Sequence, residues 1–145
     1  MSEVNSKQLR EMMRFLERRL GGLDEYQKTC CEVTMAQCHA VVEIGRKESI
    51  ALIELAELLK LDNSTMSRTV NNLVNKDLVK RVTNQKDRRY VTISLTEKGQ
   101  NVYESIEKDM DSYYEKVFKD IPENKRIQLI ESLQNLIEAL DINKR

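Results

Sequence analysis

The stretch ELAELLKLDNSTMSRTVNNLVNKDLVKR, residues Glu54–Arg81, decides the fold predicted for this chain. Apolar residues recur at three- and four-residue steps in two blocks, which predicts a short helix over 52–60 and a second one up to about Lys76. Between the blocks lies Asp62, one of the residue types that cap helix N-termini. The tripeptide KLD leaves room only for a tight connection, so the pair is a helix-turn-helix candidate.

The hydrophobic period changes immediately after these helices. The segments LVKRVTN (78–84) and YVTISL (90–95) alternate apolar and polar residues, as half-buried strands do. The polar segment NQKDRR (84–89) overlaps the first of them and predicts a hairpin tip. A two-stranded antiparallel ribbon placed directly after the helix pair makes the candidate a winged helix-turn-helix.

Two further helices are predicted before this unit. The first covers Asn5–Leu20 and is expected to end or loosen at Gly21-Gly22, because glycine disfavours a helix interior. The second begins after Thr34, a plausible N-cap, and runs to about Ile44, where Gly45 is expected to close it.

Helical patterns return after the ribbon. Thr96 is predicted to open a long helix that extends to about Phe118, and Pro122 punctuates the chain before a last helix. The predicted fold is therefore mainly α, an α+β winged helix with six helices and a two-stranded β-wing.

The composition places the chain among soluble globular proteins. Its 145 residues are 40% hydrophobic and 33% charged, a balance that can bury a core. No apolar run approaches the ~20 residues of a membrane helix, and the N-terminus lacks the apolar stretch of a signal peptide. Three cysteines are an odd number, which argues against a disulfide-built secreted fold. We expect a cytoplasmic protein with reduced thiols and no membrane partner.

The net charge is zero, but the charges are unevenly distributed along the chain. Residues 62–90 contain seven Lys or Arg and three Asp or Glu, whereas residues 91–145 contain eight and eleven. The predicted helix-turn-helix and ribbon thus form a basic island between acidic flanks. This asymmetry indicates an anionic partner for the middle of the chain; a merely solvated face is the structural alternative.

The second helix of the pair has a polar face without a carboxylate. Serine, asparagine and arginine side chains suit base edges and phosphates, and an ordinary surface helix more often mixes Glu with Lys. Asn71 is expected to help select a base, because asparagine can pair bidentately with adenine. The predicted contacts with double-stranded DNA are Asn63, Ser64, Thr65, Ser67, Arg68 and Asn71.

The hairpin tip carries Lys86, Arg88 and Arg89. A basic tip can reach into a minor groove, where negative potential concentrates and attracts arginine. A solubilising charged turn is the alternative, but the preceding helix favours a DNA-binding wing.

The quoted stretch, followed by DRRYVTISLTEKG (87–99), resembles the MarR family of bacterial transcription regulators. The similarity is close over about 34–99 and includes the signature Asp87, Arg89, Leu95 and Thr96. It implies that Arg89 enters the minor groove and that Arg88 contacts the backbone. Ala51 departs from the family pattern, since a capping Ser or Thr is common there; its absence costs ~1 kcal/mol of cap stability.

The resemblance also implies an obligate homodimer with a helical interface, in which two winged helices grip a pseudo-palindromic operator. We expect one winged-helix domain over 1–145, with a DNA-binding lobe at about 30–99. The dimerisation arms would be residues 1–29 and 100–145. Repression is the family default, because a dimer across a promoter blocks polymerase.

All three cysteines, Cys30, Cys31 and Cys38, lie within nine residues, near the expected junction of the arms and the lobes. Three interpretations remain open: a thiolate site for arsenite or a soft metal, a redox switch, or a buried structural Cys38 beside two bystanders. His39 is the neighbour of Cys38 and would point about 100° away on a helix, which disfavours it as a fellow ligand. No cofactor is otherwise indicated.

Two other function classes are weighed against a regulator released by a thiol-reactive effector. An enzyme is disfavoured, because the chain has no glycine-rich loop and its lone histidine diverges from the adjacent thiol. A helical adaptor could use the basic island to bind an acidic protein. A regulator that responds to a small phenolic ligand, with the cysteines as bystanders, is the closest alternative.

Overall fold

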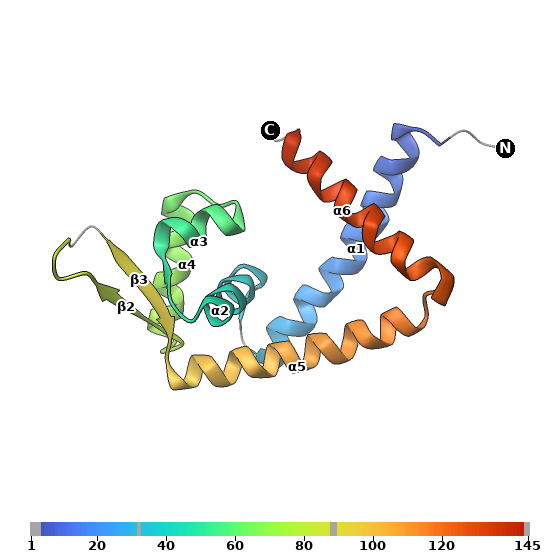
Figure 1. Cartoon of the computed structure of the whole chain (residues 1–145). Helices are drawn as coiled ribbons and strands as arrows, with labels where there is room; N and C mark the ends of the chain where they lie inside the picture. The colour runs from blue at the N-terminus through green and yellow to red at the C-terminus, as the bar shows by residue number, and fades with distance from the viewer. Residues whose placement is uncertain (1–3, 32, 88–89, 144–145) are drawn as a thin grey trace. The chain divides into compact units, whose positions relative to one another are not determined.

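The computed structural model describes residues 4–31, 33–87 and 90–143 (Figure 1). These residues group into two compact units, Met1–Ile106 and Glu107–Arg145. The elements, in chain order, are α1 (Ser6–Cys31), α2 (Met35–Lys47), β1 (Ile50–Ala51), α3 (Leu52–Leu59), α4 (Asn63–Asn75), β2 (Val79–Thr83), β3 (Val91–Leu95), α5 (Glu97–Lys119), the 3-10 turn η1 (Glu123–Lys125) and α6 (Arg126–Ile142). The predicted mainly α winged-helix class with six helices is confirmed.

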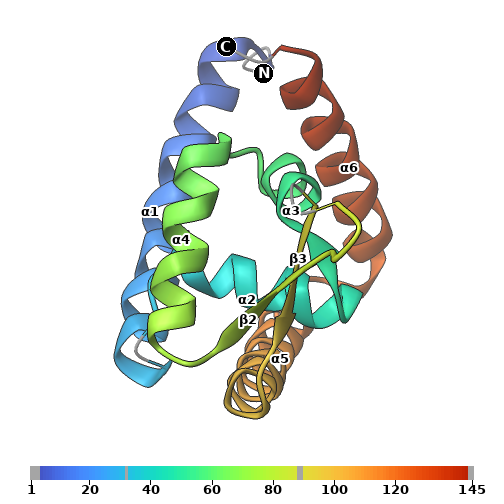
Figure 2. The same ribbon diagram turned by 90° about the vertical axis from the view of Figure 1, so that its left-hand side faces the viewer.

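The first unit is built around α2, α3 and α4, with a small sheet beside them. Figure 2 views this unit from the side of the wing and shows α4 and β2 in front of α2. Its core consists of apolar side chains that recur along each helix and strand at the spacing of that element. Burial of this apolar surface stabilises the short helices. The largest fully buried side chains are Val33, Val41, Ile44, Leu55, Met66, Val70, Leu73, Ile93 and Ile106.

The tight turn between α3 and α4 forms as the sequence predicts. Lys60 adopts the left-handed conformation with φ 59°, and its backbone N–H donates to Glu57 O at 3.2 Å. Leu61 N donates to Ala56 O at 2.9 Å, which satisfies another terminal carbonyl of α3. Asp62 then caps α4. Ala51 precedes α3 without any side-chain cap, the departure from the family pattern that the sequence indicates.

The sheet has three strands in the order β1-β3-β2, one more than the predicted ribbon. The two predicted strands pair antiparallel, with Arg81 opposite Ile93 and Val79 opposite Leu95. The added strand, β1, is only two residues long and pairs Ile50 with Ile93. Two residues are too few to show the alternation that predicts a strand in a sequence. The strand β1 forms because β3 supplies its pairing partner.

Two predicted helix ends are wrong, both at glycines. The first helix does not end at Gly21-Gly22 but continues to Cys31. A helical glycine costs about 1 kcal/mol relative to alanine, too little to end a long helix, and a Cβ on Gly21 would meet open space. The second helix passes Gly45 and ends at Lys47, before Glu48 with φ 65°. A Cβ on Gly45 would overlap the Tyr103 ring, so this glycine permits close packing of α2 on α5.

The start of α5 is joined to the turn that follows α4. The Thr96 hydroxyl donates to Asp77 O at 2.6 Å and accepts from Gly99 N at 3.0 Å, while Thr96 N donates to Leu78 O at 3.1 Å. Asp77 has φ 61°, so the chain reverses here between α4 and β2. A Cβ on Gly99 would overlap the carbonyl of Leu78. Thr96 therefore caps α5 and fastens it to the winged helix, as its sequence position predicts.

The second unit contains the end of α5, η1 and α6. Arg126 closes the corner between the helices, since its Nε donates to Ile121 O at 3.0 Å and its guanidinium lies 5.0 Å from the centre of the Phe118 ring. No described residue of α6 is buried within the chain. None of the helices in the described ranges is long and apolar enough to cross a membrane.

Gly99→Ala should destabilise the fold by about 1–3 kcal/mol, because the new methyl group must displace backbone at Leu78. Gly21→Ala is the matched control: its methyl group meets open space and should stabilise α1 by about 0.5–1 kcal/mol. Urea unfolding at one fixed protein concentration measures both. Equal effects of the two substitutions would contradict the close approach at Gly99.

Candidate nucleic-acid interface

Helix α4 separates a buried apolar face from an exposed polar one. Met66, Val70 and Leu73 are fully buried, as predicted. Val74, expected on that face, is instead 37% exposed, and Thr69 is buried in its place. The Thr69 hydroxyl donates to Thr65 O at 3.1 Å, so its polar group is satisfied inside the helix and its methyl group can pack.

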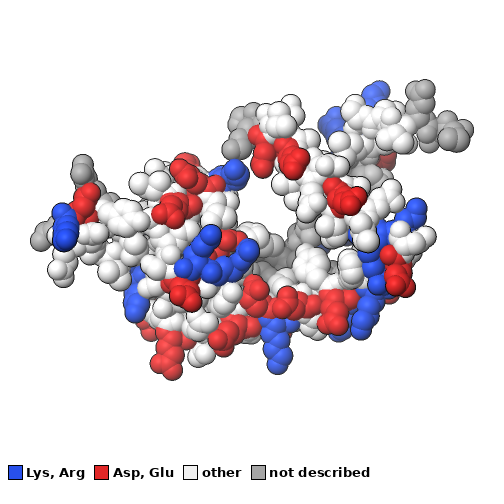
Figure 3. Space-filling view, viewed as in Figure 1, with Lys and Arg blue, Asp and Glu red and all other residues white. Residues whose placement is uncertain are grey.

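The six α4 residues predicted to contact DNA lie along the other side of the helix. The structure leaves four of them exposed and Thr65 and Ser67 partly exposed; the six are Asn63, Ser64, Thr65, Ser67, Arg68 and Asn71. No Asp or Glu occurs from Asn63 to Lys76. By contrast, acidic side chains gather along α5 (Figure 3). The polar face of α4 is therefore a surface that offers many donors and repels no anion.

The N-terminus of α4 is complemented by its own cap. Asp62 accepts from Thr65 N at 2.6 Å and from the Ser64 hydroxyl at 3.0 Å. The backbone N–H of Thr65 is the main reason that the pKa of the Asp62 carboxyl lies below its ordinary value, and the hydroxyls of Thr65 and Ser64 lower it further. A carboxylate already occupies the positive end of this helix, so α4 offers an anion its exposed side chains more than the backbone N–H groups of its terminus.

The C-terminus of α4 is tied to the beginning of α2. Lys76 Nζ donates to Gln37 Oε1 at 2.8 Å. The same oxygen accepts from Thr34 N, and Gln37 N donates to the Thr34 hydroxyl, which completes a capping box. Gln37 is only 7% exposed. One buried amide thus links the α1–α2 junction to the end of the polar helix.

Arg81 of β2 also belongs to this surface, although it is not among the contacts predicted from the sequence. Its Nη2 donates to Asn71 Oδ1 on α4. Both side chains are exposed. The only signal in the sequence is a basic residue in a strand next to a polar helix, which does not reveal the register that brings the two together.

The turn between β2 and β3 is organised by Asn84. Its Oδ1 accepts from the backbone N–H of Lys86 at 2.8 Å and of Asp87 at 3.2 Å, an Asx turn. Lys86 is exposed. Arg88 and Arg89, the other predicted wing contacts, lie outside the described residues, so their roles stay predictions.

Of the three cysteines, the structure describes the side chain of Cys38. Cys38 is buried in α2, while its neighbour His39 is exposed, as their adjacent helical positions predict. Cys30 and Cys31 are the last residues of α1, and their side chains lie outside the described residues. Among the described side chains, no group of three or more His, Cys, Asp or Glu could hold a metal ion.

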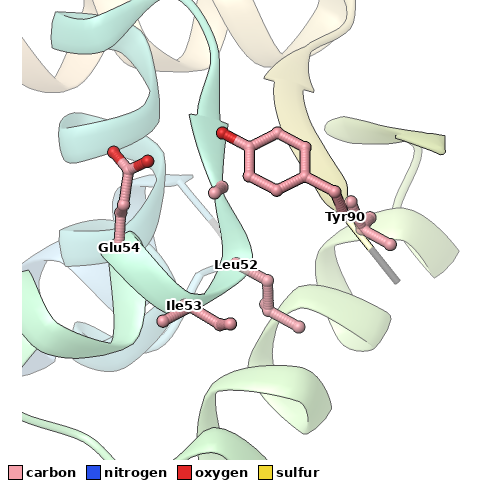
Figure 4. A pocket seen from close by; sticks show the side chains of 6 residues that line it. Leu52, Ile53, Glu54 and Tyr90 are labelled. Atoms are coloured by element: carbon pink, nitrogen blue, oxygen red, sulfur yellow. The ribbon is translucent and has the colours of Figure 1, made fainter. Parts of the chain in front are cut away.

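A small hollow lies between the first turn of α3 and the start of β3. Its volume is about 230 Å³, and its lining consists of Ala51, Leu52, Ile53, Glu54, Tyr90 and Val91. Figure 4 shows the Tyr90 ring extending from the start of β3 toward the short strand that precedes α3. The volume is below the ~300–1,000 Å³ of typical organic-ligand sites, so the hollow suits at most a very small apolar molecule.

A short helix pair with an acid-free polar second helix, followed by a basic β-ribbon, defines a winged helix-turn-helix. The MarR family model matches residues 33–91, the segment that forms this unit. The chain belongs to the MarR family, whose members are transcriptional regulators and not enzymes.

Known relatives agree with this assignment over most of their length. The chain is 27% identical over 104 residues to the HTH-type transcriptional regulator BilQ of Clostridium symbiosum, covering 72% of each chain. It is 24% identical over 113 residues to the transcriptional repressor MdtR of Bacillus subtilis, covering 78% of this chain and 73% of that one. The crystal structure of Streptococcus pneumoniae FabT in complex with DNA has the same fold, with a TM-score of 0.83, 20% identity and coverage of 94% and 99%.

Asp62→Ala should destabilise the protein at neutral pH, because α4 loses its cap. The pKa of Asp62 is lowered on folding, so its contribution is present above the unfolded pKa of about 3.9 and is lost as pH falls through the folded value. The stability difference between wild type and this variant should therefore shrink below about pH 4.

Asp62→Asn is the control, because asparagine keeps the acceptor and does not titrate. The difference in stability between the Asp62→Asn and Asp62→Ala variants should stay constant across the same range. Urea unfolding at several pH values measures the stability of all three proteins. A stability difference between wild type and Asp62→Ala that did not change with pH would contradict the capping role of the carboxylate.

Proposed function

We propose that the protein binds double-stranded DNA as a homodimer and represses transcription from a pseudo-palindromic operator in the cytoplasm. The observation that carries the proposal is the exposed face of α4, which is free of carboxylates and backed by a fully buried apolar face. An α-helix of this kind fits a major groove, where its side chains reach base edges and phosphates.

The proposed contacts divide between the helix and the wing. On α4, Arg68 would bind guanine or a phosphate, and the shorter polar residues would contact nearby bases and backbone. At the tip of the ribbon, basic residues would enter the adjacent minor groove. The contact set is Asn63, Ser64, Thr65, Ser67, Arg68, Asn71, Lys86, Arg88 and Arg89.

The homodimer is supported by apolar surface that the chain alone does not cover. Helix α6 exposes a stripe at helical spacing in which Ile127 is 76% and Ile137 58% exposed, and Ile130, Leu133 and Leu140 continue it. The α1 helix exposes a similar stripe that includes Leu9, Met12 and Phe15. Contiguous apolar surface of this kind marks an interaction site. A second copy covers such stripes symmetrically, and we propose residues 1–29 and 100–145 as the dimerisation arms beside a DNA-binding lobe at about 30–99.

Repression is proposed because a dimer seated across a promoter obstructs polymerase. The name of the relative MdtR describes that protein as a repressor.

The first test is binding of the wild-type protein to the duplex upstream of its own gene, measured by fluorescence anisotropy over a range of salt concentrations. Affinity should fall steeply with salt, because Lys and Arg release counterions from the phosphates. Arg68→Ala should weaken binding by roughly tenfold, and a substitution of an exposed basic residue of α2 outside the contact set, Lys47→Ala, should leave it unchanged. Absent or salt-independent binding would overturn the proposal and favour a protein-binding adaptor.

We further propose that thiol chemistry at Cys30, Cys31 or Cys38 releases the DNA. Cys38 is buried directly after Gln37, whose amide connects the start of α2 to Lys76 at the end of α4. A bulky or charged adduct on a buried thiol would displace its surroundings and so disturb that connection. Arsenite, a soft metal or an oxidant could each act in this way; a phenolic effector with bystander cysteines is the alternative.

Stoichiometric arsenite or hydrogen peroxide should release the reduced wild-type protein from its duplex. A variant with Cys30, Cys31 and Cys38 all changed to Ser should stay bound under the same treatment. Anisotropy measures release, and mass spectrometry identifies the modified thiol. Equal release of both proteins would refute thiol sensing, and retention of both would direct the search to organic effectors.

A further inference from the structure

We propose that Arg81 binds a DNA phosphate and that Asn71 is the residue that positions its guanidinium. The inference rests on the proposed DNA binding and deepens it, because it adds a contact outside α4 and the wing tip. It also assigns Asn71 a role that differs from the base reading expected from the sequence.

The register of the sheet brings Arg81 to the polar helix. Arg81 lies directly opposite Ile93 in the antiparallel ladder. Residues in directly opposed positions project from the same face of a sheet, and Ile93 is fully buried in the core. Arg81 therefore projects toward the helices, and because β2 is exposed after its first residue the side chain reaches the surface beside α4, where Nη2 donates to Asn71 Oδ1.

The adjacent residue Lys80 has the opposite orientation. It pairs with Ser94, so it projects from the other face of the sheet. Lys80 is also exposed and has the same formal charge as Arg81. Lys80 is therefore a natural control for Arg81: it tests whether a phosphate contact depends on the position of the cation or only on its charge.

The partner of Arg81 is neutral, which leaves the cation available. An aspartate would orient the guanidinium and also cancel its charge, whereas an amide oxygen orients it without doing so. One of five N–H donors is used by Asn71. In the described part of the chain Arg81 makes no ion pair, so the remaining donors can bind the two oxygens of a phosphate as a fork.

The same bond restricts what Asn71 can do. Bidentate pairing with adenine requires the amide oxygen as an acceptor and the amide nitrogen as a donor. The oxygen already accepts from Arg81, so adenine would have to share this oxygen with the guanidinium and use its second lone pair. Asn71 in its observed state therefore has its two N–H donors and one lone pair left for DNA, and its orientation is fixed by Arg81.

The experiment measures duplex binding by the full chain, on its upstream duplex and on a random duplex of equal length and composition, across a salt series. Arg81→Ala should weaken binding to both duplexes by a similar factor, roughly tenfold, and reduce the magnitude of the salt slope by about one. Lys80→Ala should change both quantities much less. Arg81→Lys should keep the slope and lose part of the affinity, because it retains the charge without the fork.

A double-substitution cycle tests the positioning role. Asn71→Ala should weaken binding in the wild-type background and have no further effect in the Arg81→Ala background, because its contribution passes through Arg81. Circular dichroism verifies folding of every variant; should Arg81→Ala not fold, Arg81→Lys replaces it in the cycle, with partial coupling expected.

The outcomes separate this inference from the proposed function. If the wild-type protein bound no duplex, or bound it without salt dependence, the proposed function itself would be overturned. Wild-type binding with Arg81→Ala indistinguishable from Lys80→Ala would overturn only the phosphate contact. An Asn71→Ala loss confined to the upstream duplex, and equal in both backgrounds, would restore Asn71 as an independent reader of a base.

Discussion

The arrangement of the winged helix depends on the close approach of Gly99 to the carbonyl of Leu78. Only a residue without a Cβ lets the first turn of α5 come this near to the chain that connects α4 to β2. Thr96 then bonds to both Asp77 and Leu78, so the end of the polar helix, the start of the wing and the long helix share one joint. The orientation of α4 is set there, because Asp77 reverses the chain at positive φ immediately after that helix.

A second connection holds the same helix from another side. Lys76 at the end of α4 bonds to Gln37, a buried amide that also completes the cap of α2. Because a buried polar group is costly when it loses its partner, displacement of the α1–α2 junction is transmitted to α4 as a change in hydrogen bonding. The cysteines lie on both sides of this cap, so a signal at that junction has a short physical route to the polar surface.

The surface itself shows how a chain of zero net charge can attract an anion. Lys and Arg outnumber Asp and Glu by seven to three in residues 62–90, while acidic residues prevail in residues 91–145, where they gather along α5 (Figure 3). Asp62 is the acid at the start of α4, and it is engaged as a cap. The neutral Asn71 beside Arg81 follows the same logic, because it orients a cation without removing its charge.

The sequence by itself determined the winged helix, the caps at Thr34, Asp62 and Thr96, and the acid-free face of α4, because each depends on periodicity or on a local hydrogen bond. Tertiary structure alone decided the rest. Gly21 and Gly45 do not end helices, since an exposed glycine costs little and a packed one permits contact with Tyr103. Strand β1 exists only because β3 pairs with it. The pairing of Arg81 with Asn71 depends on sheet register, which joins residues ten positions apart and leaves no local pattern.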